Sequence, residues 1–449
     1  MSSLLISASG IRGIIGKTLT PEMAAGFAAA FGNFVQRGKV VVGSDSRTSN
    51  QMLTYAVFSG LLSVGCEIID VGICPTPSLQ LMVEKLKANG GIAITGSHNP
   101  VEWNALKFIR SDGLFLYPEQ GEQVLEIYRT KKIERAAWNE IKEVHRENSA
   151  IENHLERVLN LVNRGKIRSK KFKVVLDACN GAGALISPEL IRRLGCEVIE
   201  LNCEPNGVFS HPPEPIPSNL RELSQVVKAE GADVGFAHDA DADRVALVSE
   251  KGEILPEGYS LLLVSKFVLS KKRGLVVTNL STTQALDDIA REFDCPVKRT
   301  KVGDVYVSRC MREEGAVIGG EGNGGVIIPQ VHYARDGIAG IALVLEYLAT
   351  SNKPLSELAE EIPRYYMIKG KIKFPKENLS LLKVNLRREF EEDKLNFLDG
   401  VKVYLNEGWV HIRASGTEPV VRIIAEAKTK KDAETLYNLG LRYLNNAKN

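Results

Sequence analysis

One strand–loop–helix–strand unit recurs three times along this chain. Each copy opens with a short β-branched run, continues through a polar or glycine-rich loop and a helical stretch, and ends in a second strand that carries a cysteine near its start. The opening strands are Lys39–Gly43, Lys173–Asp177 and Leu275–Thr278. A crossover of about twenty residues in each copy is long enough to connect parallel strands. Three copies of one α/β unit predict three similarly built domains.

The rest of the chain indicates the expected domain limits. The charged segment 121–164 is helix-patterned, which predicts a helix that closes the first domain and a connection into the second. From about Arg364 the pattern changes to alternating strand signals and a closing helix, 431–446, typical of a smaller α+β domain with an antiparallel sheet. We therefore expect four domains, with limits at 1–150, 151–253, 254–363 and 364–449.

Composition is that of an ordinary globular enzyme. A net charge of +2 gives no reason to expect nucleic acid or a membrane as partner, so any phosphate site must be built locally. Seven cysteines without a CxxC pair predict reduced thiols. The N-terminus lacks a basic lead-in and no apolar run approaches the ~20 residues of a membrane span, so we expect a cytoplasmic protein. Nothing in the sequence decides between a monomer and a dimer.

A buried-strand run, Gly91–Thr95, ends in Gly-Ser-His-Asn-Pro at 96–100. A strand end followed by a glycine turn puts Ser97 at the mouth of an α/β sheet, where ligands commonly bind. A hydrolase nucleophile elbow needs G-x-S-x-G, and Thr95 and Asn99 exclude it. Taken alone, the motif also fits a turn whose Ser and Asn side chains bond the backbone.

Three aspartates at alternate positions, Asp239, Asp241 and Asp243, follow the strand-like run 233–237. Carboxylates on such a tight loop can converge on one hard cation, and Mg²⁺ takes oxygen ligands of this kind. Without a cation they would repel one another or shift their pKa values. Arg244 at the sixth position excludes an EF-hand. An acidic surface turn is the alternative, and the apolar strands on both sides disfavour it.

Two further loops suit a phosphorylated sugar. The glycine-rich run 319–325 lets the backbone approach a ligand closely, and its Glu321 and Asn323 can read sugar hydroxyls, although a flexible connector fits the glycines equally well. The run 413–419, RASGTEP, with Arg422 in the next strand combines two guanidinium groups, two hydroxyls and a glycine turn. That combination suits a dianionic phosphate, with a decorated hairpin turn as the alternative.

Taken in order, TGSHNP, DADADR, GEGNGG and RASGTEP strongly resemble the motifs of the α-D-phosphohexomutase family, which includes phosphoglucomutases, phosphomannomutases and phosphoglucosamine mutases. The resemblance covers essentially the whole chain. It implies four domains around a central cleft, namely three similar α/β domains with mixed sheets and a smaller C-terminal α+β domain with an antiparallel sheet.

The resemblance also implies a role for each matching residue. Ser97 would carry the transferable phosphoryl group and complete a Mg²⁺ site with Asp239, Asp241 and Asp243. Lys107, in an N-A-L-K run where the family has N-G-x-K, would be a general acid or base. The other catalytic candidates are Arg12, His98 and Arg244. The substrate-binding candidates are Thr300, Gly303, Glu321, Asn323, Arg413, Ser415, Gly416, Thr417 and Arg422.

The glycine-rich loop departs from the usual G-E-x-S-G-H pattern, with Asn323 in place of Ser and Gly325 in place of His. The change removes a residue sometimes assigned to proton transfer, and His332 is a candidate replacement. It also leaves the substrate open among glucose, mannose, glucosamine and galactosamine phosphates.

The activity implied is the interconversion of hexose or hexosamine 1-phosphate and 6-phosphate, an intramolecular phosphotransfer of the isomerase class. It would pass through a phosphoserine enzyme and a sugar 1,6-bisphosphate, with one Mg²⁺ per active site and with Ser97 primed by a sugar bisphosphate. Two rivals stay open. A Mg²⁺-dependent sugar phosphatase would share the acidic loop, and a non-catalytic sugar-phosphate sensor would share the fold.

Overall fold

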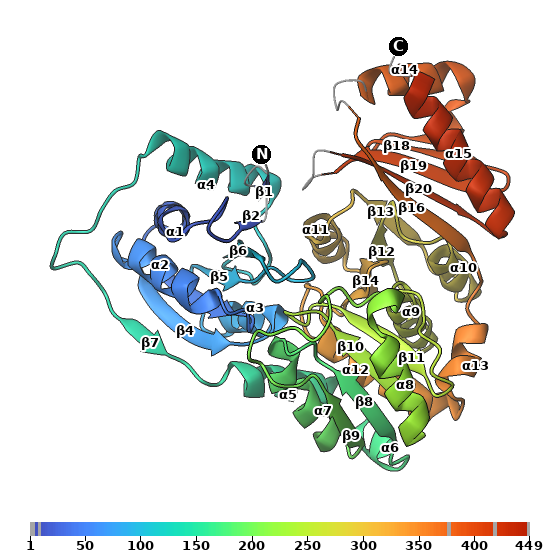
Figure 1. Cartoon of the computed structure of the whole chain (residues 1–449), viewed down its shortest axis with the longest axis horizontal. Helices are drawn as coiled ribbons and strands as arrows, with labels where there is room; N and C mark the ends of the chain where they lie inside the picture. Colours follow the sequence, from blue (N-terminus) through green and yellow to red (C-terminus); the bar gives the residue numbers. More distant parts are fainter. Residues whose placement is uncertain (1–4, 8–9, 375–378, 416–419, 447–449) are drawn as a thin grey trace.

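The computed structural model describes residues 5–7, 10–374, 379–415 and 420–446, and its strands form four separate sheets in succession along the chain. Figure 1 shows them as four bodies in an arc, from the blue N-terminal part on the left to the red C-terminal part at the upper right. Each sheet carries its own helices. The expected architecture of three α/β domains followed by an antiparallel one is confirmed.

The first domain is a seven-stranded mixed sheet with helices on both faces. Its strands are β1 (Leu5–Ser7), β2 (Gly10–Ile14), β3 (Lys39–Ser44), β4 (Glu67–Ile73), β5 (Gly90–Ile94), β6 (Trp103–Arg110) and β7 (Val144–Arg146), in the sheet order β1-β2-β6-β5-β3-β4-β7. Its helices are α1 (Pro21–Phe34), α2 (Asn50–Leu62), α3 (Thr76–Lys85) and α4 (Pro118–Thr130). Val40 and Val42 of β3 pack in one core with α1 and α2, whereas Val41 packs on the other face with α3. Burial on both faces explains why β3 reads as a continuous β-branched run.

The second and third domains each hold a four-stranded sheet of three parallel strands and one antiparallel edge strand. The strands, in sheet order, are β11 (Val245–Ser249), β10 (Val234–His238), β8 (Lys173–Asp177) and β9 (Glu197–Leu201), then β13 (Val297–Thr300), β12 (Val276–Asn279), β14 (Ile318–Glu321) and β15 (Gly325–Ile327). The helices are α5 (Ala150–Leu161), α6 (Arg164–Arg168), α7 (Ser187–Arg193), α8 (Arg221–Glu230), α9 (Tyr259–Lys271), α10 (Ala285–Glu292), α11 (Asp304–Glu314), α12 (Gly337–Ser351) and α13 (Leu355–Glu360). The three recurring units of the sequence are the parallel pairs β3–β4, β8–β9 and β12–β13.

Helix α12 joins the second and third domains. Its residues Ile338 and Leu345 are buried in one hydrophobic cluster with Val174 of β8 and Val276 of β12. A single core therefore spans both sheets. Because one helix packs against two domains, the domain limits given above stay predictions.

The segment 121–164 holds the expected helix and connection, but the helix ends earlier than its charged, helix-like pattern suggests. Helix α4 ends at Thr130, and Lys131 takes a left-handed φ of 53°. The chain then runs extended to α5, with β7 pairing with β4 and the Glu147 amide donating to the Asp70 carbonyl at 2.9 Å. Pairing with the open edge of β4 satisfies backbone groups that a longer helix would have satisfied within itself.

The fourth domain is an antiparallel sheet covered on one face by two helices. Its strands, in sheet order, are β16 (Tyr366–Ile372), β20 (Val421–Ala427), β19 (Gly408–Ala414), β18 (Val401–Leu405) and β17 (Leu395–Asn396). The helices are α14 (Leu379–Glu389) and α15 (Lys430–Asn446). Val410 and Ile412 of β19 pack with Leu436 of α15. The alternate residues of β19 therefore occupy the other face, which meets the third domain.

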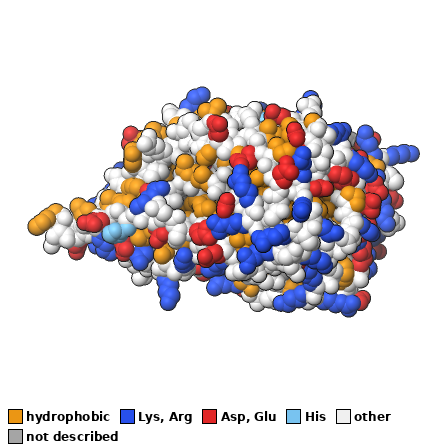
Figure 2. All heavy atoms as spheres, turned by 90° about the horizontal axis from the view of Figure 1, so that it is seen from below, with side chains coloured by type: hydrophobic (Ala, Val, Ile, Leu, Met, Phe, Trp, Pro, Cys, Tyr) orange, Lys and Arg blue, Asp and Glu red, His pale blue; other side chains and the backbone are white. Residues whose placement is uncertain are grey.

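Within the part of the chain that the structure describes, no helix is long and apolar enough to cross a membrane. Figure 2 shows basic and acidic side chains interspersed on one face of the molecule, with apolar side chains scattered among them. All seven cysteines lie in the described residues and none of them forms a disulfide. Burial raises the pKa of the Cys74 thiol to about 12, which makes it unreactive.

Candidate active site

Ser97 lies just beyond the carboxyl end of β5, in the loop that leads to β6. It is 2% exposed, and its φ of 49° is in the left-handed region that few residues other than glycine adopt. Its amide donates to Thr95 Oγ1 at 2.8 Å. Its hydroxyl donates to Asp239 Oδ2 at 2.8 Å, across 142 residues of sequence. The predicted nucleophile therefore contacts the predicted metal loop.

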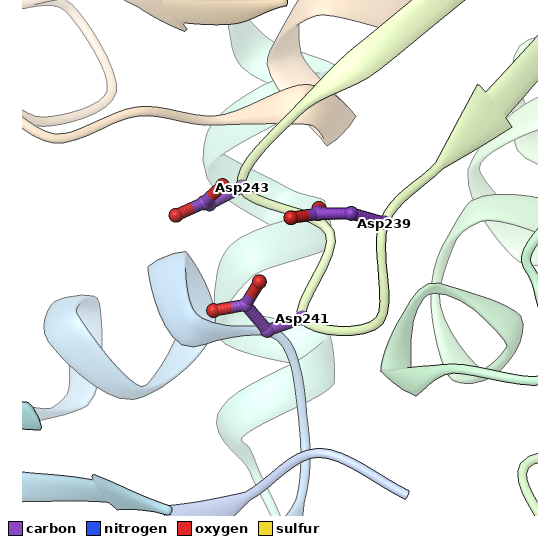
Figure 3. A group of neighbouring side chains, drawn as sticks. All are labelled: Asp239, Asp241 and Asp243. Atoms are coloured by element: carbon purple, nitrogen blue, oxygen red, sulfur yellow. The ribbon is translucent and has the colours of Figure 1, made fainter. Parts of the chain in front are cut away.

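The three aspartates lie on the turn between β10 and β11, and their side chains project to the same side of that turn (Figure 3). One carboxylate oxygen from each lies within 4.8 Å of the others. Ala242, with a left-handed φ of 53°, tightens the turn between Asp241 and Asp243. The alternate spacing in the sequence thus becomes a cluster of three buried carboxylates.

The donor set of this cluster fits a hard divalent cation. Burial, with repulsion from Asp243 and Asp241, raises the pKa of Asp239 well above its ordinary value, and burial also raises the pKa of Asp243. The Oδ1 atoms of Asp241 and Asp243 are buried and have no hydrogen-bond donor among the described residues. Buried acceptors without a partner cost free energy, which a bound cation would recover. Oxygen ligands of this kind are those that Mg²⁺ takes.

Lys107 reaches the same cluster from β6. Its Nζ lies 2.7 Å from Asp241 Oδ2 and 3.8 Å from Asp243 Oδ2. The Thr76 hydroxyl donates to the same Asp241 oxygen at 2.7 Å. Burial alone would raise the pKa of Asp241, but the Lys107 ammonium and these hydrogen bonds outweigh it and hold the pKa below its ordinary value. Asp241 is therefore the ionised anchor of the cluster.

Two arginines and a histidine lie near Ser97 and the metal loop. Arg244 Nη2 donates to His98 Nδ1 at 3.0 Å, and its Nε lies 3.9 Å from Asp239 and 3.7 Å from Asp243. Burial and repulsion from Arg244 lower the pKa of Arg12, which lies on β2. The same two causes hold the pKa of His98 well below its ordinary value, so the imidazole is neutral. Buried guanidinium groups beside a serine suit a phosphate dianion.

Glu321, at the end of β14, connects the glycine-rich loop with the metal loop. Its Oε1 accepts from the Asn279 side chain at 2.8 Å and from the Gly303 amide at 3.1 Å. Its Oε2 accepts from Arg335 Nη1 at 3.2 Å, and Arg335 Nη2 donates to Asp243 Oδ2 at 2.6 Å. Arg335 thus joins the predicted sugar-reading loop to the predicted metal ligands.

The other residues of these loops have local contacts. Asn323 Oδ1 accepts from the Gly325 amide at 3.3 Å, and the Thr300 hydroxyl donates to the Lys301 carbonyl at 2.8 Å. A Cβ at position 325 would collide with the Arg335 side chain. The glycine that replaces the usual histidine therefore makes room for Arg335.

His332 is engaged elsewhere. Its Nε2 lies 3.1 Å from Asp336 Oδ2, the ring is buried, and the same carboxylate oxygen lies 2.9 Å from His154 Nε2. The other Asp336 oxygen accepts from two amides at the start of α12. The His332 ring therefore helps to hold the start of α12 in place.

The fourth domain contributes a row of cations. Arg413 on β19 lies opposite Arg422 on β20, which lies opposite Lys371 on β16. Directly opposite residues project to the same face of a sheet. Arg413 Nη1 lies 3.7 Å from Asp399, and Asp399 accepts from the Val302 amide at 3.0 Å. The row is thereby connected to the loop that holds Thr300 and Gly303.

Ser415 follows β19 and is 2% exposed, and its amide donates to the Val420 carbonyl at 2.8 Å. Gly416 and Thr417 lie outside the described residues.

Sequence reasoning missed Thr76, Asn279 and Arg335. Thr76 begins α3 three residues after β4, and Asn279 ends β12. An α/β sheet commonly binds ligands beyond the carboxyl ends of its strands, and that rule could have found both residues. No sequence signal marks Arg335.

Models of the four phosphoglucomutase/phosphomannomutase domains match this chain in order. The α/β/α domain I model matches residues 4–135, domain II residues 152–252 and domain III residues 257–366. The C-terminal domain model matches residues 367–438. Together the four models span most of the chain.

Whole-length relatives carry two kinds of name. The chain is 42% identical over 451 residues to a phosphoglucomutase/phosphomannomutase of Thermococcus kodakarensis, with 99% of each chain covered. It is 41% identical to a probable phosphoglucosamine mutase of Methanopyrus kandleri, with 95% of each covered. Among solved structures, a phosphoglucomutase/phosphomannomutase family protein of Burkholderia thailandensis matches with a TM-score of 0.86 and 28% identity, covering 99% of this chain and 97% of the other.

Proposed function

This chain belongs to the phosphoglucomutase/phosphomannomutase family, and from that membership we propose that it interconverts hexose or hexosamine 1-phosphate and 6-phosphate through a phosphorylated Ser97. The observation that carries the proposal is the 2.8 Å hydrogen bond from the Ser97 hydroxyl to Asp239, inside a cluster of three buried carboxylates. Ser97 would be loaded once by a sugar bisphosphate. The seven unpaired thiols support a reducing, cytoplasmic setting.

In the forward half-reaction, a free hydroxyl of the sugar phosphate attacks the phosphorus of phospho-Ser97. A new P–O bond forms to the sugar, and the bond from phosphorus to Ser97 Oγ breaks. Lys107, an ammonium paired with Asp241 at 2.7 Å, gives a proton to the departing Oγ and takes the proton of the sugar hydroxyl. The sugar bisphosphate then turns over, and its other phosphate returns to Ser97 by the reverse steps.

Asp239, Asp241 and Asp243 would hold the Mg²⁺ ion. A divalent cation there supplies charge that stabilises the transferring phosphoryl group. The protein's own cations share that task, because Arg12 and Arg244 lie near Asp241 and Asp239 respectively. The neutral His98 accepts from Arg244 and so fixes the direction of that guanidinium group.

The third and fourth domains would hold the part of the substrate that does not react. Glu321, Asn323, Thr300 and Gly303 would read the sugar hydroxyls. The phosphate that is not reacting would bind to Arg413, Ser415, Gly416, Thr417 and Arg422. Either end of the bisphosphate presents the same dianion to this anchor, so one site serves both orientations. The names of the two relatives leave the glucose, mannose and glucosamine phosphates all as candidates.

The test is a phosphorus-31 NMR assay on the 1-phosphates of glucose, mannose, glucosamine and galactosamine, with Mg²⁺ and a trace of bisphosphate. We expect the 6-phosphate of at least one sugar without release of inorganic phosphate, and no turnover by Ser97→Ala. Inorganic phosphate as the main product would indicate a phosphatase instead. Binding of a sugar phosphate without any turnover would indicate a sensor.

A further inference from the structure

Arg47 lies in the loop after β3 and is the most enclosed cation beside Ser97. It is 2% exposed, and its side chain is closed from solvent. Its two terminal nitrogens donate to four backbone carbonyls, three in the loop that carries Ser97 and one at the first residue of β6. These carbonyls belong to Ser97 and Asn99, both at 2.7 Å, Pro100 at 2.8 Å and Trp103 at 3.1 Å. One guanidinium group thus satisfies four acceptors between Ser97 and the start of β6.

A closed ring of hydrogen bonds fixes the Ser97 backbone at both ends. The Ser97 amide donates to Thr95 Oγ1, and the Thr95 hydroxyl donates to Asp45 Oδ2 at 2.6 Å. Arg47 Nε donates to that same oxygen at 3.1 Å, and Arg47 Nη2 donates to the Ser97 carbonyl. The amide and the carbonyl of Ser97 are therefore both tied to the pair Asp45–Arg47.

This ring holds a conformation that serine does not favour. The φ of 49° at Ser97 costs free energy and persists only where the surroundings determine it. The preceding residue must be glycine, because a Cβ at Gly96 would lie 2.7 Å from the Arg47 guanidinium carbon. Without the guanidinium group, the Ser97 carbonyl would lose its hydrogen bond and the space beside Gly96 would open. The backbone at Ser97 could then leave its left-handed conformation.

The same arginine lies where the first domain meets the second. Its guanidinium carbon lies 4.9 Å from the centre of the Phe209 ring, which belongs to the loop that follows β9 in the second domain. The neighbouring Ser46 hydroxyl donates to the Asn180 carbonyl at 2.7 Å. A Cβ at Gly207 would collide with the backbone of residues 46–48. Arg47 is thus fixed from both domains, and Asp239, the acceptor of the Ser97 hydroxyl, lies on the second.

We propose that Arg47 is a positioning residue for phosphoryl transfer: its fork onto four carbonyls aims Ser97 Oγ at the metal loop, without touching substrate. The inference rests on the proposed mutase function, since it concerns the same serine. Displacing Oγ by about 1 Å is enough to cost about 100-fold in rate. The loss is expected in kcat, with KM unchanged, because the substrate-binding loops lie in the other domains.

The experiment compares Arg47→Lys and Arg47→Ala with the wild type in the mutase assay. A lysine keeps the charge and loses the fork, so we expect kcat to fall about 10-fold for Arg47→Lys and about 100-fold for Arg47→Ala, with KM within about threefold. Guanidinium ion at millimolar concentration should restore kcat of Arg47→Ala about 10-fold, whereas methylammonium should not. If Arg47 only stabilised the fold, guanidinium and methylammonium would not differ in their effect on the kcat of Arg47→Ala.

The matched control is Arg110→Ala, in the same domain. Arg110 also pairs with a carboxylate, Asp112 at 2.8 Å, and stacks over an aromatic ring, Tyr117 at 3.9 Å. It should keep wild-type kcat and show no response to guanidinium. If Arg47→Ala does not fold, Arg47→Lys decides alone. Wild-type kcat in Arg47→Lys, or a rise in KM with kcat unchanged, overturns the proposal, whereas a wild type without turnover overturns the mutase function itself.

Discussion

Asp239 and Asp241 are two positions apart in the chain, yet their surroundings move their pKa values in opposite directions. Burial acts on both. Asp241 has the Lys107 ammonium at 2.7 Å, whereas Asp239 has the neutral Ser97 hydroxyl and two neighbouring carboxylates. The residue that touches the nucleophile is thus the carboxylate under the greatest repulsion, and it gains most from a cation.

This imbalance predicts the effect of Asp239→Asn. In the absence of Mg²⁺ the change removes like-charge repulsion, so the free energy of unfolding should rise by about 1 kcal/mol. For the wild type, Mg²⁺ at 100 times its Kd should add about 2.7 kcal/mol, and this gain should vanish in the variant. Urea unfolding with and without Mg²⁺ measures both quantities.

Asp177→Asn is the matched control for that measurement. Asp177 is another buried aspartate of the second domain, but it lies 3.0 Å from His211 and accepts from the Cys179 amide. Its replacement should lower the stability of the metal-free protein. A fall in stability for Asp239→Asn as well would contradict the repulsion argument.

Among the secondary-structure elements, the start of α12 contacts the metal loop directly. The Gly337 amide at its start donates to the Ala242 carbonyl at 3.2 Å, and a Cβ at Gly337 would meet the Arg244 carbonyl at 2.5 Å. Asp336 caps the helix through the amides of Ile338 and Ala339. Burial would raise the pKa of Asp336, but its pairs with His154 and His332 outweigh burial and hold the pKa below its ordinary value, so Asp336 is ionised. The helix start is therefore both a cap and a support for the turn 239–244.

Removing that cap should destabilise the molecule strongly. Asp336→Ala loses two hydrogen bonds to amides and leaves His154 and His332 buried without their acceptor, which together cost about 3 kcal/mol. Thermal and urea unfolding measure the loss. The control is Thr429→Ala at the exposed start of α15, where the lost hydroxyl accepts from the Asp432 amide and the loss should stay below about 1 kcal/mol. Equal losses of stability in the two variants would contradict the proposed contribution of the buried histidine contacts of Asp336.

For the whole molecule, the position of the fourth domain depends on a buried polar contact with the third. Lys402 donates to the Leu280 carbonyl at 2.8 Å, and His411 lies between the Ser281 hydroxyl at 3.0 Å and the Asp399 carbonyl at 2.7 Å. Burial lowers the pKa of His411 to about 3, with the nearby cations Lys402, Arg413 and Arg299 acting in the same direction. The contact therefore exists with a neutral imidazole.

Acid should weaken this contact. The unfolded chain binds a proton at His411 below pH 6.5, while the folded protein does so only below about pH 3, so stability falls as the pH drops through this window. Between pH 7 and pH 5 the wild type should lose about 2 kcal/mol more than His411→Gln, whose side chain does not titrate. Urea unfolding of both proteins at the two pH values gives this difference. An identical pH dependence would mean that His411 is protonated in the folded state.

Much of this architecture could be predicted from the sequence, because the burial of a strand or helix face determines how its apolar residues are spaced. The β-branched runs at 39–43, 173–177 and 275–278 became parallel strands covered on both faces, and the alternating tail became an antiparallel sheet. The helical pattern continues beyond Thr130, but the chain there is not helical, because β7 pairs with the open edge of β4 instead. Local periodicity does not say which edge is open.

The sequence by itself determined the domain order, the strand and helix types and the motifs that hold Ser97 and the three aspartates. Only the tertiary structure decided that the Ser97 hydroxyl meets Asp239, that Lys107 pairs with Asp241, and that Arg47 and Arg335 hold the loops together. The contacts of Ser97 and Lys107 span 142 and 134 residues. Their distances arise from how sheets and helices of different domains pack. No short pattern of residue types encodes that packing, so neither the partner nor the pKa of a buried charge can be read from its neighbours in sequence.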